Sequence, residues 1–210
     1  MPIPLSTLPG HRALHDKVVA ALGLCQESQR VDFKETAPWN TLRDKLTKTV
    51  LAMGNLRDGG IAVVGVSERA PNWDRTGISA EHLRTYDVDD MLGYFATFVS
   101  PFAEVDVVEV LHDGATFLAV QAHEFDEVPL VCKRNGADPN GAGLFEGAVY
   151  VRPLGGVPQT TRVMNAQQMH ELLDLAAEKK ARKIQRQARR IGMVAPDLDN
   201  DAFDRELGDL

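Results

Sequence analysis

The sequence predicts an α+β fold, a single mixed sheet flanked by helices with a long basic helix near the C-terminal end. Two observations lead to this class. Helical and strand-like segments alternate first, a strand-rich stretch follows, and a long helical pattern comes last. The 210 residues are 44% hydrophobic and 25% charged, which excludes a wholly disordered chain and allows a sizeable core.

The first two elements follow from the spacing of apolar residues. Residues 1–10 contain three prolines and are expected to form an irregular lead-in. Residues 14–22 place apolar side chains three and four positions apart, which predicts a short amphipathic helix that stops at Gly23. Residues 30–34 form a β-like run, so the first strand is expected there.

A helix and a buried strand are predicted next. Residues 39–56 have one apolar face and charged residues elsewhere, which predicts a helix that ends before Asp58-Gly59-Gly60. Residues 61–66 are a near-continuous apolar run, rich in β-branched residues. Such a run is typical of a strand covered on both faces, so we expect it at the centre of the sheet.

The middle of the chain predicts one helix and several strands. Residues 88–99 predict a helix that ends near a proline. Residues 105–111 and 116–122 alternate around a His-Asp-Gly turn, which predicts a hairpin. Residues 130–133 and 147–152 predict two further strands, joined by a glycine-rich loop.

Charge is arranged in blocks toward the C-terminal end. Residues 165–191 predict a long helix that is apolar on one face only in its first half. The net charge is +6 on residues 178–190, −5 on residues 197–210 and −8 on residues 1–177, against a total of −7. We expect the first half of the helix to pack on the body and the second half to project. The alternative is a solvated helix masked by the acidic tail.

These features divide the chain into four parts, which are a lead-in and helix start (1–19), one domain (20–175), a basic helix extension (176–194) and an acidic tail (195–210).

Two distant cysteines without a CxxC neighbour predict no disulfide framework and no structural zinc. No P-loop motif is present, so no P-loop ATP site is expected. The lack of a signal peptide or a long apolar span predicts a cytoplasmic protein without a membrane partner.

Four residues form the first candidate site. Glu27 and Asp32 stand around the start of the first strand with Lys34 beside them, and Glu68 follows the buried strand. Carboxylates from adjacent segments can hold divalent cations that polarise a phosphate, and a lysine can neutralise a phosphate oxygen. The alternative is that these are ordinary solvated charges at strand ends.

Three parts of the sequence together resemble a known family. They are ESQRVDFKET at 27–36, AMGNLRDGGIAVVGVSE at 52–68, and VPLVCK with VYVRPLGGVPQTT between 128 and 161. Their order and spacing over residues 20–175 are similar to the Schlafen AlbA-type domain, which has a Glu-rich lead into EFK, a helix, AFANTxGGxIxIGVxD and a late YxRxG. The resemblance implies an α+β fold and nucleic acid as the ligand.

In the nuclease members of that family, three acidic residues coordinate metal and cut RNA. By motif position, the resemblance places these roles on Glu27, Asp32 and Glu68. If that mechanism holds, we expect the carboxylates to position Mg²⁺ or Mn²⁺ and Lys34 to stabilise charge on the phosphate. Two of the three are Asp/Glu exchanges against the family motif, and each shifts an oxygen by about one methylene. The family's animal core pairs two such lobes into a basic groove, so the resemblance also implies a homodimer.

We therefore predict a nucleic-acid-binding protein, with metal-dependent endoribonuclease cleavage of structured RNA as its enzymatic form. The expected nucleic-acid contacts are Lys34, Lys133, Arg134, Arg152, Lys179, Lys180, Arg182, Lys183 and Arg186. Two alternatives stay open. One is a noncatalytic DNA-binding regulator, and the other is an interaction or assembly subunit that recruits a protein partner through the charged helix.

Overall fold

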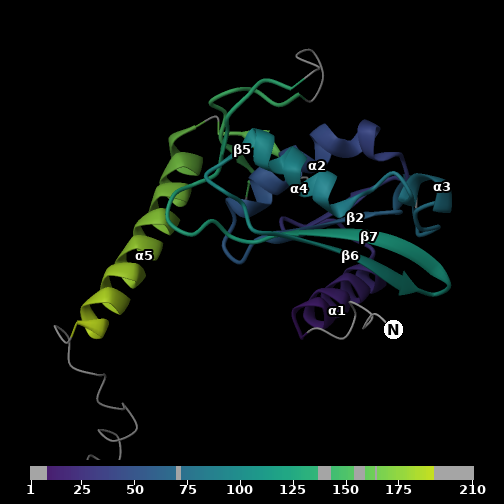
Figure 1. Ribbon diagram of the computed structural model, residues 1–210, viewed down its shortest axis with the longest axis horizontal. Helices are drawn as coiled ribbons and strands as arrows, with labels where there is room; N and C mark the ends of the chain where they lie inside the picture. Colours follow the sequence, from purple (N-terminus) through teal and green to yellow (C-terminus); the bar gives the residue numbers. More distant parts are fainter. Residues whose placement is uncertain (1–8, 70–71, 137–142, 154–158, 164, 192–210) are drawn as a thin grey trace, which may run out of the picture.

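The central feature of the fold is a four-stranded mixed sheet (Figure 1). The structure, a computed structural model, describes residues 9–69, 72–136, 143–153, 159–163 and 165–191. In spatial order the strands are β1 (Val31–Lys34), β2 (Gly60–Val64), β7 (Ala115–Ala122) and β6 (Val105–His112). β1 runs parallel to β2, while β2–β7 and β7–β6 are antiparallel. The predicted α+β class with one mixed main sheet is confirmed.

Helices cover both faces of this sheet. α1 (Pro9–Leu24) lies on one face, and α2 (Trp39–Gly54) and α4 (Val88–Phe98) lie on the other (Figure 1). α1 begins at Pro9 rather than at the predicted start near residue 14. A proline fits the first helical turn because the N–H that it lacks would have no helical partner there.

The central strand β2 supplies side chains to two hydrophobic clusters. Ile61 and Val63 pack in the cluster with α1, whereas Ala62 and Val64 pack in the cluster with α2 and α4. Successive side chains of a strand point to opposite faces, so an uninterrupted apolar run is needed where both faces are covered. All five residues of β2 are buried, which confirms its predicted central position.

Three two-stranded sheets surround the main one. They are β3 (Ser67–Arg69) with β4 (Asn72–Asp74), β5 (Val99–Ser100) with β8 (Val131–Cys132), and β9 (Tyr150–Val151) with β10 (Thr161–Arg162). The predicted hairpin is confirmed, since β6 and β7 pair in continuous register. The predicted strands near 130 and 150 are present, but each pairs with a different short partner that sequence pattern does not mark. A one-turn helix, α3 (Ala80–Leu83), was also not predicted.

The last described element is the long helix α5 (Ala166–Arg190), which extends away from the sheets (Figure 1). The Asn165 side chain accepts a hydrogen bond from the Gln168 backbone N–H at 2.9 Å and so caps its first turn. Leu172 and Leu175 are the buried residues of the helix. The first half therefore packs on the body, as the sequence predicts.

Candidate functional site

Asp32 is the buried centre of the candidate site. It lies on β1, and only 5% of its surface is exposed. Its Oδ1 accepts a hydrogen bond from Arg152 Nη1 at 3.1 Å, and its Oδ2 accepts one from Thr49 Oγ1 of α2 at 3.1 Å and pairs with Lys34 Nζ. Burial acts to raise the pKa of Asp32, but Lys34 and Arg152 outweigh it and hold this pKa below its ordinary value. Asp32 is a fixed negative charge with both oxygens engaged.

Arg152, a predicted nucleic-acid contact, is buried and joins two segments of the chain. It follows β9 and is only 2% exposed. Besides Asp32, its Nη2 donates to the carbonyl oxygens of Ser28 at 2.9 Å and Val31 at 3.4 Å, and Gln29 Nε2 donates to the Arg152 carbonyl at 2.7 Å. The guanidinium joins β9 to the turn before β1. Asp32 draws it inward, so it does not lie at the surface where a nucleic-acid contact has to be.

Glu27, Lys34 and Glu68 line one cavity of about 520 Å³, and Trp73 also contributes to its wall. Glu27 Oε1 accepts a hydrogen bond from the Phe33 backbone N–H at 2.9 Å. Burial raises the pKa of Glu27, and this hydrogen bond offsets part of the effect. Glu68, on β3, is exposed. The fold thus brings three of the four predicted catalytic residues to one cavity.

The three carboxylates do not fit a preassembled metal centre. Mg²⁺ and Mn²⁺ bind through oxygen lone pairs, and a carboxylate ligand has to present at least one oxygen to the ion. Both Asp32 oxygens are occupied by two cations and a hydroxyl, which already offset its charge. In the described ranges, no group of three or more His, Cys, Asp or Glu side chains is placed to hold a metal ion.

Part of the basic helix is paired with acidic residues of the body. Three of its predicted cations form ion pairs, which are Lys179 with Glu124 at 3.1 Å, Arg182 with Glu178, and Lys183 with Glu127. Arg57 reaches across from the loop after α2 to the same Glu178. The pairs made by Lys179, Lys183 and Arg57 hold the middle of α5 against the protein, whereas the Arg182–Glu178 pair lies within the helix. The acidic tail proposed to mask the helix lies outside the described residues.

Other predicted cations face solvent. Lys180 and Arg186 of α5 are exposed, as are Lys133 and Arg134 after β8. Arg190, near the end of the helix, is exposed as well. Within the part of the chain that the structure describes, none of these five has a carboxylate within 4.0 Å. They can therefore meet an external anion without first leaving an internal partner.

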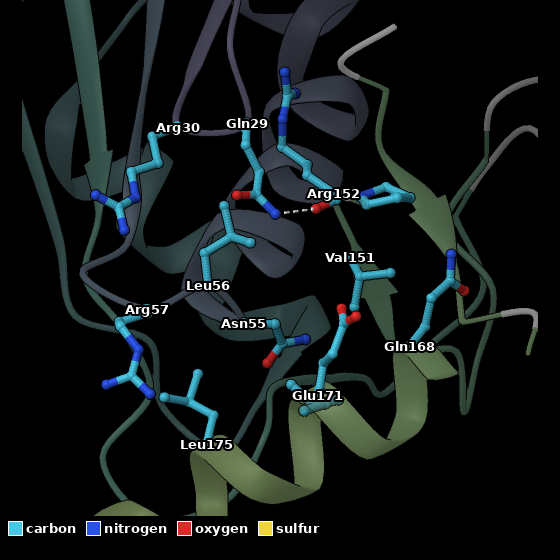
Figure 2. A pocket seen from close by; sticks show the side chains of 12 residues that line it. Gln29, Arg30, Asn55, Leu56, Arg57, Val151, Arg152, Gln168, Glu171 and Leu175 are labelled. Carbon is cyan, nitrogen blue, oxygen red and sulfur yellow. Dashed lines mark hydrogen bonds between the residues drawn. The ribbon is translucent and has the colours of Figure 1, made fainter. Parts of the chain in front are cut away.

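A second cavity, of about 290 Å³, lies between the end of α2 and the start of α5. Figure 2 shows Arg30 and Arg57 on one side of it and Gln168 on the other, with Glu171 projecting from α5. The two arginines are already paired, Arg30 with Asp58 and Arg57 with a glutamate of α5. A ligand in this cavity would compete with internal ion pairs for both cations.

Two residues that position the site were not predicted as part of it. Thr49 supplies a hydroxyl to Asp32 from the buried face of α2, and a threonine within an apolar helical stripe was its only signal. Asn55 donates to the carbonyl oxygens of Leu130 at 2.9 Å and Tyr150 at 3.0 Å, and accepts from the Leu130 N–H at 2.7 Å. It fastens both later strand segments to the end of α2. Its place in the AMGN segment was the available signal.

Comparison with known proteins identifies a family over most of this region. The family model described as Schlafen, AlbA_2 matches residues 27–157, which is more than half of the chain. No curated protein matches. Among the described helices, none combines the length and apolar character needed to cross a membrane.

Two solved structures are similar to the chain. The crystal structure of the DIP2311 protein from Corynebacterium diphtheriae is 20% identical with a TM-score of 0.47, and the match covers 77% of this chain and 28% of that one. The solution NMR structure of the N-terminal domain of an ATP-dependent DNA helicase RecG-related protein from Nitrosomonas europaea is 21% identical with a TM-score of 0.43. That match covers 72% of this chain and 95% of the domain. The chain therefore spans little more than a quarter of DIP2311.

Proposed function

The chain belongs to the Schlafen AlbA_2 family, and from this premise we propose that it binds nucleic acid along α5. The observation that supports the proposal is the division of charge on that helix. Lys179 and Lys183 pair with carboxylates of the body, whereas Lys180, Arg186 and Arg190 are exposed and lack such a partner among the described residues. The first group holds the helix in place, and the second presents positive charge to solvent.

The exposed cations of α5 are spaced for a polyanion. Lys180 and Arg190 are separated by about 15 Å along the helix axis, from the helical rise of about 1.5 Å per residue. That length corresponds to about four phosphates of one strand at about 3.4 Å each. Residues 1–177 carry a net charge of −8, which repels a polyanion from most of the body. Binding is therefore local to the part of α5 that extends from the body.

The test is the salt dependence of binding to labelled single-stranded RNA and DNA. The variant K180Q/R186Q/R190Q removes three charges from α5, and R12Q/K17Q/R84Q removes three exposed charges from α1 and the turn after α3 as a matched control. The slope of log K against log salt should fall by about 0.7 for each lost phosphate contact in the α5 variant only. Equal losses in both variants would contradict the proposal, as would no binding at low salt.

A metal-dependent endoribonuclease is the competing function, and we propose that the Glu27, Asp32 and Glu68 set does not perform it. Asp32 would have to leave Arg152 and Lys34 to bind metal. The test incubates the protein and its E27Q and E68Q variants with structured RNA and Mn²⁺. No cleavage dependent on either glutamate is expected. Mn²⁺-dependent cleavage that both variants abolish would show that these carboxylates do assemble a metal site.

The remaining functional predictions concern partners. A homodimer stays a prediction, and light scattering should then give twice the chain mass. A noncatalytic DNA-binding regulator is compatible with the α5 interface and would show tighter binding to duplex DNA than to RNA. An assembly subunit would use the same helix on an acidic protein partner. Failure of both nucleic acids to bind at low salt would favour that alternative over the one proposed.

A further inference from the structure

Two cations away from α5 lie on neighbouring aromatic rings. Lys48 Nζ, from α2, is 5.5 Å from the centre of the Tyr150 ring, and Arg162 Cζ, from β10, is 4.5 Å from the centre of the Phe145 ring. The Tyr150 hydroxyl accepts a hydrogen bond from the Phe145 N–H at 3.0 Å and donates one to the Gly143 carbonyl at 3.0 Å. Arg162 is also the cross-strand partner of Tyr150. The two rings that the cations face are thus joined by a hydrogen bond.

Among the described residues, neither of these two like charges forms an ion pair. In the described part of the chain, neither Lys48 nor Arg162 has a carboxylate within 4.0 Å, whereas Lys34 and Lys179 are each ion-paired. Burial lowers the pKa of Lys48, and the charge of Arg162 lowers it further. Two neighbouring cations without a counterion destabilise each other, and a bound anion would remove that cost.

The residues around Arg162 indicate which chemical group would be attached to the anion. Arg162 lines a cavity of about 580 Å³ whose apolar wall includes Phe145, Val149 and Met169. A guanidinium fork matches the oxygens of a phosphate, and flat rings pack on apolar and aromatic walls. Glu146 lines the same cavity, and a carboxylate there suits the exocyclic amino group of a base rather than a phosphate.

We propose that Lys48 and Arg162 form an anion site for the phosphate group of a nucleotide, with the base against the apolar wall of the adjoining cavity. The inference goes beyond the proposed function because it uses none of the α5 cations Lys180, Arg186 and Arg190. A free nucleotide and one unit of a nucleic-acid strand share this chemistry, since each joins a phosphate to a base. The experiment therefore has to separate the two sources.

The test titrates the full chain with cytidine monophosphate and, separately, with inorganic phosphate, and follows Lys48 through its ¹³Cε resonance. Bound phosphate should raise the pKa of Lys48 toward its ordinary value. K48Q and R162Q should each weaken binding by about tenfold, the loss expected for one charged hydrogen bond. K17Q, which removes an exposed lysine of α1, is the control and should bind like the unmodified protein.

Urea unfolding of K48Q and R162Q checks that each variant folds, because each substitution relieves repulsion between like charges but also removes a cation from an aromatic ring. A second arm measures a labelled oligocytidine. Weaker oligocytidine binding in K48Q and R162Q assigns the site to a strand, and loss of cytidine monophosphate binding alone assigns it to a free nucleotide. The variant K180Q/R186Q/R190Q should keep cytidine monophosphate binding, so failure of the α5 interface is distinguishable. An unmoved Lys48 resonance with both small ligands, or an equal loss in K17Q, overturns the proposal.

Discussion

Replacing Asp32 with asparagine should lower the free energy of unfolding by about 3 kcal/mol, because it leaves two cations buried without their anion. Asparagine keeps the shape of the side chain but removes its charge. Arg152, 2% exposed, would lose the carboxylate 3.1 Å from its Nη1, and Lys34 would lose its ion pair. Breaking one side of a buried ion pair typically costs about 3 to 5 kcal/mol, and the partly exposed Lys34 places the estimate at the lower end.

Urea unfolding followed by circular dichroism measures this loss. The matched control is D58N, which makes the same chemical change in the exposed ion pair between Arg30 Nη2 and Asp58 Oδ2, 3.2 Å apart. That change should cost less than about 1 kcal/mol. A cycle with R152M and D32N/R152M isolates the coupling, and the double variant should lose less than the sum of the single losses. The reasoning is refuted if D32N costs no more than D58N or if the cycle shows no coupling.

The same ion cluster predicts a pH dependence. The folded-state pKa of Asp32 is held below its unfolded value, so its charged form contributes stability at neutral pH. This contribution is fully present above the unfolded pKa and is lost as the pH falls through the folded one. The stability difference between the unmodified protein and D32N should therefore be constant from pH 5 to pH 8 and shrink below about pH 4.

Two further predictions test the packing that positions the site. G59A should destabilise the protein by more than about 1 kcal/mol beyond G114A, as measured by urea unfolding. Both glycines have positive φ, so both substitutions strain the backbone. Only at Gly59 would the added Cβ also collide with the Ala122 carbonyl oxygen, at 2.1 Å. L172A should lower the free energy of unfolding by about 2 to 3 kcal/mol and speed amide exchange along α5, because Leu172 is only 4% exposed. L173A should change neither quantity much, because Leu173 is 52% exposed. Equal exchange in both would show that α5 is not held by its apolar contacts.

The predictions that held are those that rest on local pattern. The unbroken apolar run of β2 reports burial on both faces, and alternation around a glycine turn reports the β6–β7 hairpin. The 3.6-residue spacing likewise identified α2 and α5. Two-residue strands such as β5 and β10 have no periodicity to detect, so neither they nor their pairing could be predicted.

At the candidate site, too, sequence grouped some residues correctly but did not reveal a long-range ion pair. Glu27, Lys34 and Glu68 were predicted together, and they do line one cavity. Asp32 and Arg152 were predicted in functional roles, yet each is the other's buried partner across 120 residues of sequence. No local sequence signal distinguishes a carboxylate that is free to bind a metal ion from one that is paired with a distant arginine.

The order of the main elements, the burial of β2 and the block of positive charge on the last helix can be predicted from sequence, because each depends on the spacing of neighbouring residues. Which of those charges can meet an external anion is known only from the folded structure. Lys179 and Lys183 meet carboxylates of the body, whereas Lys180 and Arg186 are exposed and have no carboxylate within 4.0 Å among the described residues. The physical reason is that an ion pair depends on distances between groups far apart in the chain, and those distances exist only after folding.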